Sequence, residues 1–456
     1  MSWAVPELGA VEFGDKRLTR RSQVVLAQLG DKPTYRTPTA CGGWPETVAA
    51  YRLFDNDKVT PAKILAAHRQ RTLERMAALP LVLCVADTTE FDHTDHREII
   101  EGLGPLNYDN RRGQVGHFLL AVSPERVPLG VLGSDLWVRD EERFGSSRER
   151  KHRKLEDKES AHWVDMVRNC KQLAAQCPGT RLVYVADREA EMHELLMEVT
   201  TGEIDCVIRA QGDRAQPDPQ PLVRTAVKAS PALGRIEFDI PATDKRTARH
   251  VVATVRSAAV TLRGPWRSGQ GHLPHVPITL VHVVEDHCPP EAEPIEWFLF
   301  TTLVAGTLEQ AVRVIELYRC RWTIEVFFRV LKTGCRVEKI QLHHIDRLRT
   351  ALAFYLIIAW RVLFLTMLGR TTPELPCDAV FDTEEWQAIY MVTQRRPPPA
   401  QPPPLDQVVR MMATFGGFLG RACDGFPGPQ AIWVGLQRTR DFVLALQAHK
   451  EATRCV

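Results

Sequence analysis

The pattern of apolar and polar positions changes twice along the chain. From residue 1 to about 78, apolar residues recur at helical spacing, and Asp15, Pro45 and Thr60-Pro61 predict where helices begin. From there to about residue 303, short apolar runs and alternating stretches predict strands. Helical spacing returns at Leu308 and continues, with a proline-rich interruption, to the end of the chain.

Two short apolar runs in the middle of the chain end in an aspartate. Leu81–Ala86 precedes Asp87, and Arg181–Ala186 precedes Asp187. Such runs are typical of strands that are buried on both faces of a sheet. We therefore expect both aspartates at the carboxyl edge of one sheet, where ligand sites form in α/β folds. A hairpin that turns at 124–126 is predicted between the two runs.

These changes divide the chain into three expected parts. The first is a helical N-terminal domain at 1–78. The second is an α/β domain at 79–368, which contains a β-rich insertion at about 205–303. The third is a helical C-terminal region at 369–456, with a semi-rigid linker at 397–404.

Composition narrows the class of protein. The 456 residues are 44% hydrophobic and 25% charged, which argues for several globular domains and against a peptide hormone or toxin. The eleven cysteines include no CxxC pair, so we expect reduced thiols in a cytosolic protein. No secretory signal is visible, and Arg361 interrupts the longest apolar stretch, Ala351–Leu368, so we expect a buried helix and no membrane partner. The formal charge of +2 neither indicates nor excludes a nucleic-acid partner.

The helix predicted after Leu308 carries a stripe of polar side chains. On one continuous helix, four residues would lie within roughly 60° of one another, namely Tyr318, Arg321, Glu325 and Lys332. The arcs beside this stripe are apolar, and one of them includes Trp322. The simpler alternative is that Arg321 and Glu325 form an ordinary surface pair at i,i+4 spacing.

Three carboxylates from separate elements indicate a metal site. Asp87 and Asp187 would repel each other at one sheet edge unless a divalent cation lay between them. Together with Glu325, which has basic residues close to it in the chain, they predict a two-metal site for in-line phosphoryl transfer.

The segments around these residues resemble one known family over almost the whole chain. They are similar to the DDE transposases of insertion-sequence family four, the group that contains the Tn-five transposase. The resemblance lies in Val85–Thr89, Lys158–Ser160 with Trp163, Val185–Glu191, the Tyr-x2-Arg-x3-Glu-x6-Lys signature from Tyr318 to Lys332, and the early segments Gly14–Arg17 and Ala50–Phe54.

The resemblance implies a fold, an activity and partners. The implied fold is a ribonuclease H-like catalytic core interrupted by a β-rich insertion, in which Asp87, Asp187 and Glu325 bind two Mg²⁺ ions and Mn²⁺ substitutes. The implied activity is cut-and-paste transposition: nicking of each transposon end, hairpin formation, hairpin opening and joining to target DNA. The implied partners are double-stranded DNA and a second copy of the chain, which dimerises through its C-terminal helices, in the bacterial cytoplasm and nucleoid.

The resemblance also implies supporting residues. Contacts to the DNA backbone near the cut are implied for Tyr318, Arg321, Lys332, Arg209 and Arg188. Trp297 is implied to stack on the base that flips out when the hairpin forms, although a tryptophan in a strand is more often part of a core. The N-terminal helices are dense in cations that suit phosphate contacts, although solvated helix faces have the same composition; they include Lys16, Arg17, Arg20, Arg21 and Arg52.

Two segments depart from the family pattern or extend it. Glu90–Asp95 is unusually acidic, which argues against DNA contact there, and His93 with His96 and Asp92 offers a weak alternative zinc site in what is more often a solvated loop. The basic run Arg148–Lys154 predicts either a loop that meets target DNA or a solvated loop.

Two other classes of function remain open at this stage. One is a DNA-binding regulator derived from a transposase and without catalysis of its own. The other is a ribonuclease H-like nuclease that hydrolyses DNA and never joins ends. The presence of all three carboxylates, with Arg321 and Lys332, favours the active transposase.

Overall fold

The computed structural model describes residues 2–108, 110–141, 158–240, 247–267 and 269–454. The chain forms two compact units. The first contains Met1–Arg75, Thr88–Phe144 and Thr323–Val456, and the second contains Met76–Asp87 and Gly145–Trp322. The basic run Arg148–Lys154 lies outside the described residues.

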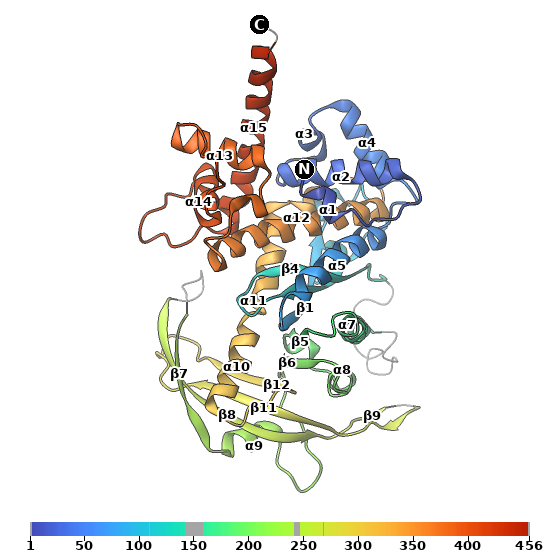
Figure 1. The fold of residues 1–456 in the computed structure, drawn as a ribbon. Helices are drawn as coiled ribbons and strands as arrows, with labels where there is room; N and C mark the ends of the chain where they lie inside the picture. The colour runs from blue at the N-terminus through green and yellow to red at the C-terminus, as the bar shows by residue number, and fades with distance from the viewer. Residues whose placement is uncertain (1, 109, 142–157, 241–246, 268, 455–456) are drawn as a thin grey trace. The chain divides into compact units, whose positions relative to one another are not determined.

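The second unit is built on a mixed sheet. Strands β1, β5 and β6 are parallel, and β12 is antiparallel to β6. The sheet then continues through β11 and β8 to β7 at its edge, and all of these pairs are antiparallel. Figure 1 shows the curvature of these outer strands. The bounds are β1 Leu81–Asp92, β5 Arg181–Ala186, β6 Asp205–Arg209, β7 Ala232–Ile240, β8 Arg249–Leu262, β11 Val276–Glu285, β12 Glu296–Thr301, and a separate small ribbon of β9 Trp266–Arg267 with β10 Gly271–His272.

Helices pack against this sheet. α10 contacts β5, β6, β7 and β8, α9 contacts β8 and β11, and α7 contacts β5. α10 begins with a capping box, in which Thr307 and Gln310 satisfy each other's backbone N–H groups. The helices are α7 Ser160–Ala174, α8 His193–Val199, α9 Val223–Ala229 and α10 Leu308–Arg319.

The first unit is mainly helical. Its N-terminal helices begin where the sequence predicts: the Asp15 carboxylate accepts a hydrogen bond from the Arg17 N–H at the start of α2. β3 and β4 form the predicted hairpin, and β2 pairs with β3. The bounds are α1 Ala4–Glu7, α2 Lys16–Asp31, α3 Thr37–Cys41, α4 Trp44–Phe54, α5 Pro61–Ala77, β2 Gly104–Pro105, β3 Arg112–Val122, β4 Pro128–Trp137, α11 Trp322–Arg329, α12 Ile345–Thr371, α13 Thr383–Gln394, α14 Leu405–Phe415 and α15 Pro429–Arg454.

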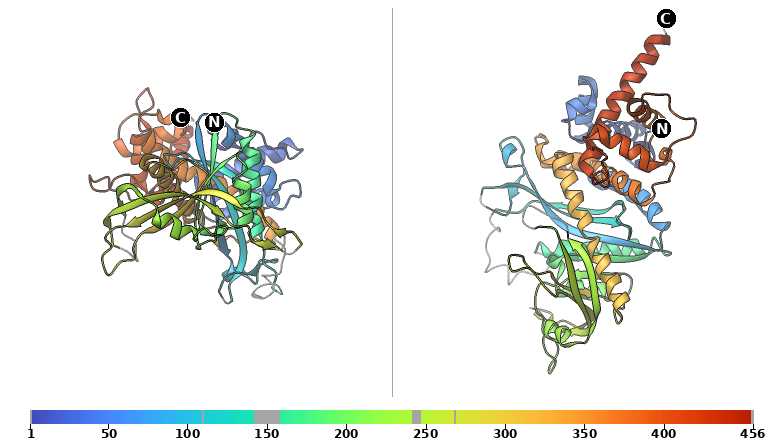
Figure 2. Two further views of the ribbon diagram at one scale, coloured as in Figure 1. Left: turned by 90° about the horizontal axis from the view of Figure 1, so that it is seen from below. Right: turned by 90° about the vertical axis from the view of Figure 1, so that its left-hand side faces the viewer.

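Helix α12 is the core of the first unit. It is apolar on all sides and contacts α2, α4, α14, α15 and β4. Among the described residues it is the one helix long and apolar enough to cross a membrane, yet 83% of its most apolar window is buried inside the protein. Figure 2 shows the whole ribbon from two further directions. The expectation of a buried helix at Ala351–Leu368 is therefore confirmed.

A buried polar network ties the start of the chain to this core. The Glu7 carboxylate accepts hydrogen bonds from His68 and, through both oxygens, from Arg75 at 3.1 Å. The other His68 nitrogen accepts the Val131 N–H of β4, and the Arg75 guanidinium lies 4.2 Å from the Trp360 ring. Burial alone would raise the pKa of Glu7, but the hydrogen bond from His68 and the charge of Arg75 lower it from 4.5 to about 2.

The sequence predicted most of these elements, with two differences in the strands. β1 does not end at Ala86 but runs on to Asp92, so the prediction that Asp87 follows the end of a strand is wrong. The fully buried part of β1 ends at Ala86, but the strand continues because Thr88 and Thr89 also favour an extended backbone. The β-rich block at about 205–303 also extends the central sheet, since β12 pairs directly with β6.

Replacement of Glu7 by glutamine should lower stability, because Arg75 would lose its buried counter-charge. We expect a loss of about 3 kcal/mol, measured by thermal or urea unfolding. The exposed Glu12→Gln is the matched control, and equal midpoints for the two variants would contradict the role of the network. The difference in unfolding free energy between wild type and Glu7→Gln should be full above about pH 4.5 and should vanish as the pH falls towards 2. At low pH the Glu7 carboxyl of the wild type is protonated, so it is as neutral as the glutamine.

Candidate active site and basic groove

Two carboxylates lie beside each other in the register of neighbouring strands in the second unit, Asp87 within β1 and Asp187 directly after β5. β1 and β5 are parallel and paired in register as far as Val85 and Val185. Two residues further on, the chain reaches Asp87 and Asp187, and adjacent strands are spaced by about 4.8 Å. From this register we expect the two carboxylates to lie near each other, and like charges that are close together require a counter-charge.

Each aspartate is held by a different partner. Asp87 Oδ2 accepts a hydrogen bond from Arg321 Nη1 at 2.9 Å, and the two side chains are 13% and 14% exposed. Asp187 accepts the Glu189 N–H at 2.8 Å, as the N-cap of a short 3₁₀ turn at Arg188–Ala190. Arg188 is exposed on this turn. The backbone thus fixes Asp187, while a cation neutralises Asp87.

A phenol and a second arginine belong to the same unit. Tyr318 is buried in the last turn of α10, and Arg209 is the last residue of β6. Burial raises the pKa of Tyr318, while Arg321 and Arg209 act to lower it, Arg209 also through a hydrogen bond. The Trp297 indole of β12 meets the Tyr318 ring edge-on, with ring centroids 5.9 Å apart.

Glu325 and Lys332 lie in the first unit, because the boundary falls between Trp322 and Thr323. Glu325 is half-buried in the first turn of α11, whose Phe328 packs against Phe118 of β3 with ring centroids 5.7 Å apart. Lys332 Nζ lies 3.9 Å from Glu338 Oε1 and 5.7 Å from the centre of the Phe91 ring. Burial lowers the pKa of Lys332, and Glu338 opposes this shift.

The prediction of one continuous helical stripe is wrong. α10 ends at Arg319 and α11 begins at Trp322, with Cys320 bonded back to Leu317 in a tighter turn. The helix widens again into a π turn at Val330–Gly334, which changes the angle per residue. Trp322 is 61% exposed instead of lying on an apolar flank.

The donor chemistry of the aspartate pair suits a hard divalent cation. Carboxylate oxygens are the preferred ligands of Mg²⁺ and Mn²⁺. Within the described part of the chain, no group of three or more His, Cys, Asp or Glu side chains is arranged so that it could hold a metal ion. His93 is buried, and burial lowers its pKa to about 4, so it belongs to the interior of the protein and not to a solvated loop.

The acidic segment at Glu90–Asp95 is largely neutralised by its neighbours. Glu90 pairs with Arg139 at 2.7 Å, and Asp92 pairs with Arg111 at 2.8 Å. Asp95 pairs with Lys339 at 2.5 Å. The excess of acids in the sequence is therefore not an excess of negative charge at this place.

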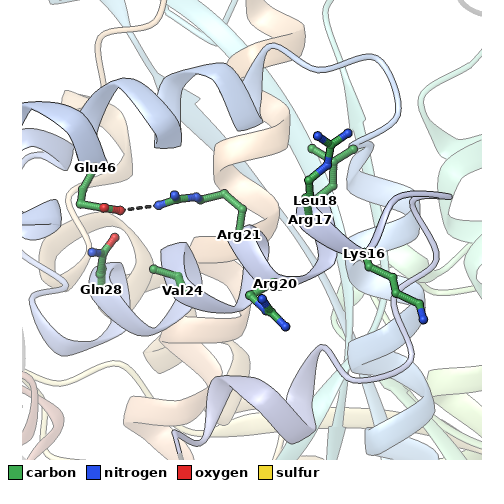
Figure 3. A pocket seen from close by; sticks show the side chains of 8 residues that line it. All are labelled: Lys16, Arg17, Leu18, Arg20, Arg21, Val24, Gln28 and Glu46. Carbon is green, nitrogen blue, oxygen red and sulfur yellow. Dashed lines mark hydrogen bonds and ion pairs between the residues drawn. The ribbon is translucent and has the colours of Figure 1, made fainter.

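A basic groove of about 780 Å³ lies on the N-terminal helices of the first unit. Figure 3 shows its lining, in which Glu46 pairs with Arg21. The lining residues are Lys16, Arg17, Leu18, Arg20, Arg21, Val24, Gln28 and Glu46. Four of the five predicted N-terminal cations thus share one surface, while Arg52 is exposed on α4 outside this lining.

Comparisons with known proteins match most of the chain. Residues 1–59 match a model described as transposase DNA-binding, 155–361 match the transposase DDE domain, and 357–452 match the transposase Tn5 dimerisation domain. Asp187 and Glu325 fall inside the DDE match, and Asp87 precedes it. One similar solved structure is a piggyBac transposase synaptic complex with hairpin DNA, at 9% identity and a TM-score of 0.34. The match covers 70% of this chain but only 54% of that one.

The mixed sheet, the paired aspartates and the DDE match define the class: the chain belongs to the DDE transposases. The DNA-binding and dimerisation matches at its two ends make it a Tn5-like member. The predicted fold class is thereby confirmed: a mixed α/β, ribonuclease H-like core with helical N- and C-terminal regions.

Two aromatic residues near the site were not predicted. Trp322 follows Arg321 in the chain. The sequence pattern placed it on a buried apolar face of the helix, but its side chain is exposed. Phe238 of β7 stacks on Trp297, with ring centroids 6.0 Å apart. Phe238 and Trp297 are 59 positions apart in the chain, and no local signal in the sequence connects them.

The groove should bind DNA through its cations and the DNA phosphates. Arg20→Ala should weaken binding to duplex DNA, and the slope of log K against log salt should fall by about 0.9 for each phosphate that the variant no longer neutralises. The control is Arg168→Ala, which removes an arginine of α7 that is paired with Glu198 of α8. An unchanged salt slope for Arg20→Ala would show that the groove does not contact the DNA backbone.

Proposed function

We propose that this protein is an active cut-and-paste DNA transposase. The observation that carries the proposal is the pair Asp87 and Asp187 on neighbouring parallel strands, in a chain that matches transposase models for DNA binding, catalysis and dimerisation. A structural role alone does not account for two carboxylates at one place of a sheet, since their mutual repulsion is destabilising.

In this proposal Asp87, Asp187 and Glu325 together hold two divalent cations, with Mg²⁺ as the natural ion and Mn²⁺ as a substitute. Glu325 follows Arg321 by four residues, and Arg321 is bonded to Asp87. Bound cations would supply charge neutralisation at phosphorus and activation of an oxygen nucleophile.

The cationic side chains would hold the DNA backbone. Arg321 carries a planar guanidinium that suits a phosphate as well as the Asp87 carboxylate to which it is bonded. Arg209 and Arg188 would act from the ends of β6 and β5, and Lys332 from the π turn after α11. Tyr318, whose phenol stays protonated because burial raises its pKa, would donate a hydrogen bond to phosphate.

One such site would serve every step of transposition. Water first displaces the 3′ oxygen at a transposon end, and the freed 3′-hydroxyl then attacks the opposite strand to close a hairpin. Water reopens the hairpin, and the same 3′-hydroxyl attacks target DNA. Each step replaces one oxygen on phosphorus with another, so one set of side chains fits all of them.

The remaining parts of the chain would recognise and pair the ends. We propose that 1–78 binds the terminal inverted repeats through the basic groove, with 79–368 as the catalytic domain. The C-terminal region, 369–456, would join two copies of the chain in the synaptic complex, which the match at 357–452 supports. Such a protein would act in the cytoplasm, on the bacterial nucleoid.

Removal of any one carboxylate should abolish cleavage and spare DNA binding. Asp87→Asn, Asp187→Asn and Glu325→Gln should each reduce Mg²⁺-dependent cleavage by on the order of a thousandfold. Asp205→Asn is the matched control, since Asp205 lies at the amino end of the neighbouring strand β6. Wild-type cleavage by any of the three variants would overturn the assignment of that residue.

The products formed from a donor DNA separate the three classes of function. The wild-type protein, Mg²⁺ and a donor with the element's own inverted repeats should give DNA joined to a target. Binding without cleavage would indicate a regulator, and nicks without joined products would indicate a hydrolytic nuclease.

Trp297 should be needed for the hairpin and not for the first nick. Trp297→Ala should nick normally and form hairpins poorly, because a flipped base loses about 1 to 3 kcal/mol of stacking. Trp266→Ala removes another tryptophan, 61% exposed on a small ribbon, and should leave the hairpin yield unchanged. A normal hairpin yield for Trp297→Ala would exclude the stacking role.

A further inference from the structure

The indole of Trp297 is already covered by another aromatic ring. Phe238 lies nearly parallel to it, with ring centroids 6.0 Å apart and 21° between the ring planes. This is the offset stacked geometry that aromatic pairs prefer. A nucleobase that stacks on an indole uses the same geometry, so Phe238 and a base compete wherever they meet the same ring face.

The two aromatic neighbours of Trp297 are held very differently. Tyr318 is 7% exposed and lies in the last turn of α10, so packing on several sides holds its ring. Phe238 is half-buried near the end of β7, which is the edge strand of the sheet. If one neighbour gives way to a base, it is therefore Phe238.

The start and the end of β7 are held by different contacts, and near the end Asp239 pairs with His250 of β8 at 2.8 Å. At Gly234, a Cβ atom would lie 2.6 Å from Leu308 Cδ2 of α10, so the two elements are in close contact there. Arg235 pairs with Asp286 at 3.0 Å. Close to the end of the strand, Phe238 instead meets the Arg319 guanidinium, 5.5 Å from its ring centre. The Arg319 guanidinium could contact the ring of a base in the same way.

We propose that Phe238 is a placeholder for the flipped base. It covers the stacking face of Trp297 while no unstacked base is present, and it moves away when the base arrives. A base that remains in the helix does not displace it, so Phe238 favours DNA in which a base has already left the stack. This inference rests on the proposed stacking role of Trp297.

The displacement can be observed at Trp297 itself. In protein labelled with 5-fluorotryptophan, the Trp297 resonance is identified by its loss in Trp297→Phe. In free protein, the resonance should differ between wild type and Phe238→Leu, because the ring of Phe238 is stacked on it. With a DNA hairpin made from the element's own end and carrying one unpaired base, the two resonances should converge.

The same change should be visible in the reaction. Phe238→Leu should raise the hairpin yield by roughly two- to tenfold, the factor expected when one competing aromatic pair is removed. Phe238→Tyr should behave like the wild type. Ile236→Ala, two residues earlier on the same face of β7, controls for weaker packing of the edge strand and should leave the yield unchanged.

Several outcomes would overturn the placeholder. The resonances of wild type and Phe238→Leu could differ on the hairpin as much as in free protein, or the hairpin could bind without moving the wild-type resonance. Phe238→Leu could also lower the hairpin yield, as removal of a wall of the base site would. Normal nicking in these experiments would leave the transposase proposal standing, whereas absent nicking by the wild type would contradict that proposal.

Discussion

The parallel pairing of β1 with β5 is the constraint on which the proposed site depends. It sets Asp87 and Asp187 at one level on adjacent strands, where their negative charges oppose each other. Arg321 compensates Asp87, and the turn after β5 fixes Asp187 through a backbone N–H. The proposed metal site rests on this arrangement, because ligands of a divalent cation act best when the fold already holds them in place.

Charge is balanced locally over much of the chain, although the whole chain carries only +2. The acids of Glu90–Asp95 are matched by nearby arginines and a lysine, and Glu7 is matched by Arg75 in the interior. The N-terminal groove is less balanced, since Arg17 pairs with Asp15 and Arg21 with Glu46, while Lys16 and Arg20 add two further cations to its lining. An unbalanced basic surface of this kind draws in a polyanion such as DNA, and the overall charge hides it.

The sequence predicted those features that depend on neighbouring residues. The capped start of α2, the hairpin β3–β4 and the buried runs ahead of both aspartates follow from local preferences. It did not predict the break at Cys320 or the π turn at Val330–Gly334, because packing around α11 decides where a helix changes its pitch. The contact of Phe238 with Trp297 depends on the curvature of several strands, which no single segment encodes.

The central claim is that the two aspartates and Glu325 act as one metal site. Electron paramagnetic resonance of Mn²⁺ bound to the protein and a DNA end tests it most directly, because two ions that share ligands are magnetically coupled. The account predicts two coupled ions in the wild type and loss of the coupling in both Asp187→Asn and Glu325→Gln. Uncoupled or unchanged Mn²⁺ signals in all three proteins would contradict it.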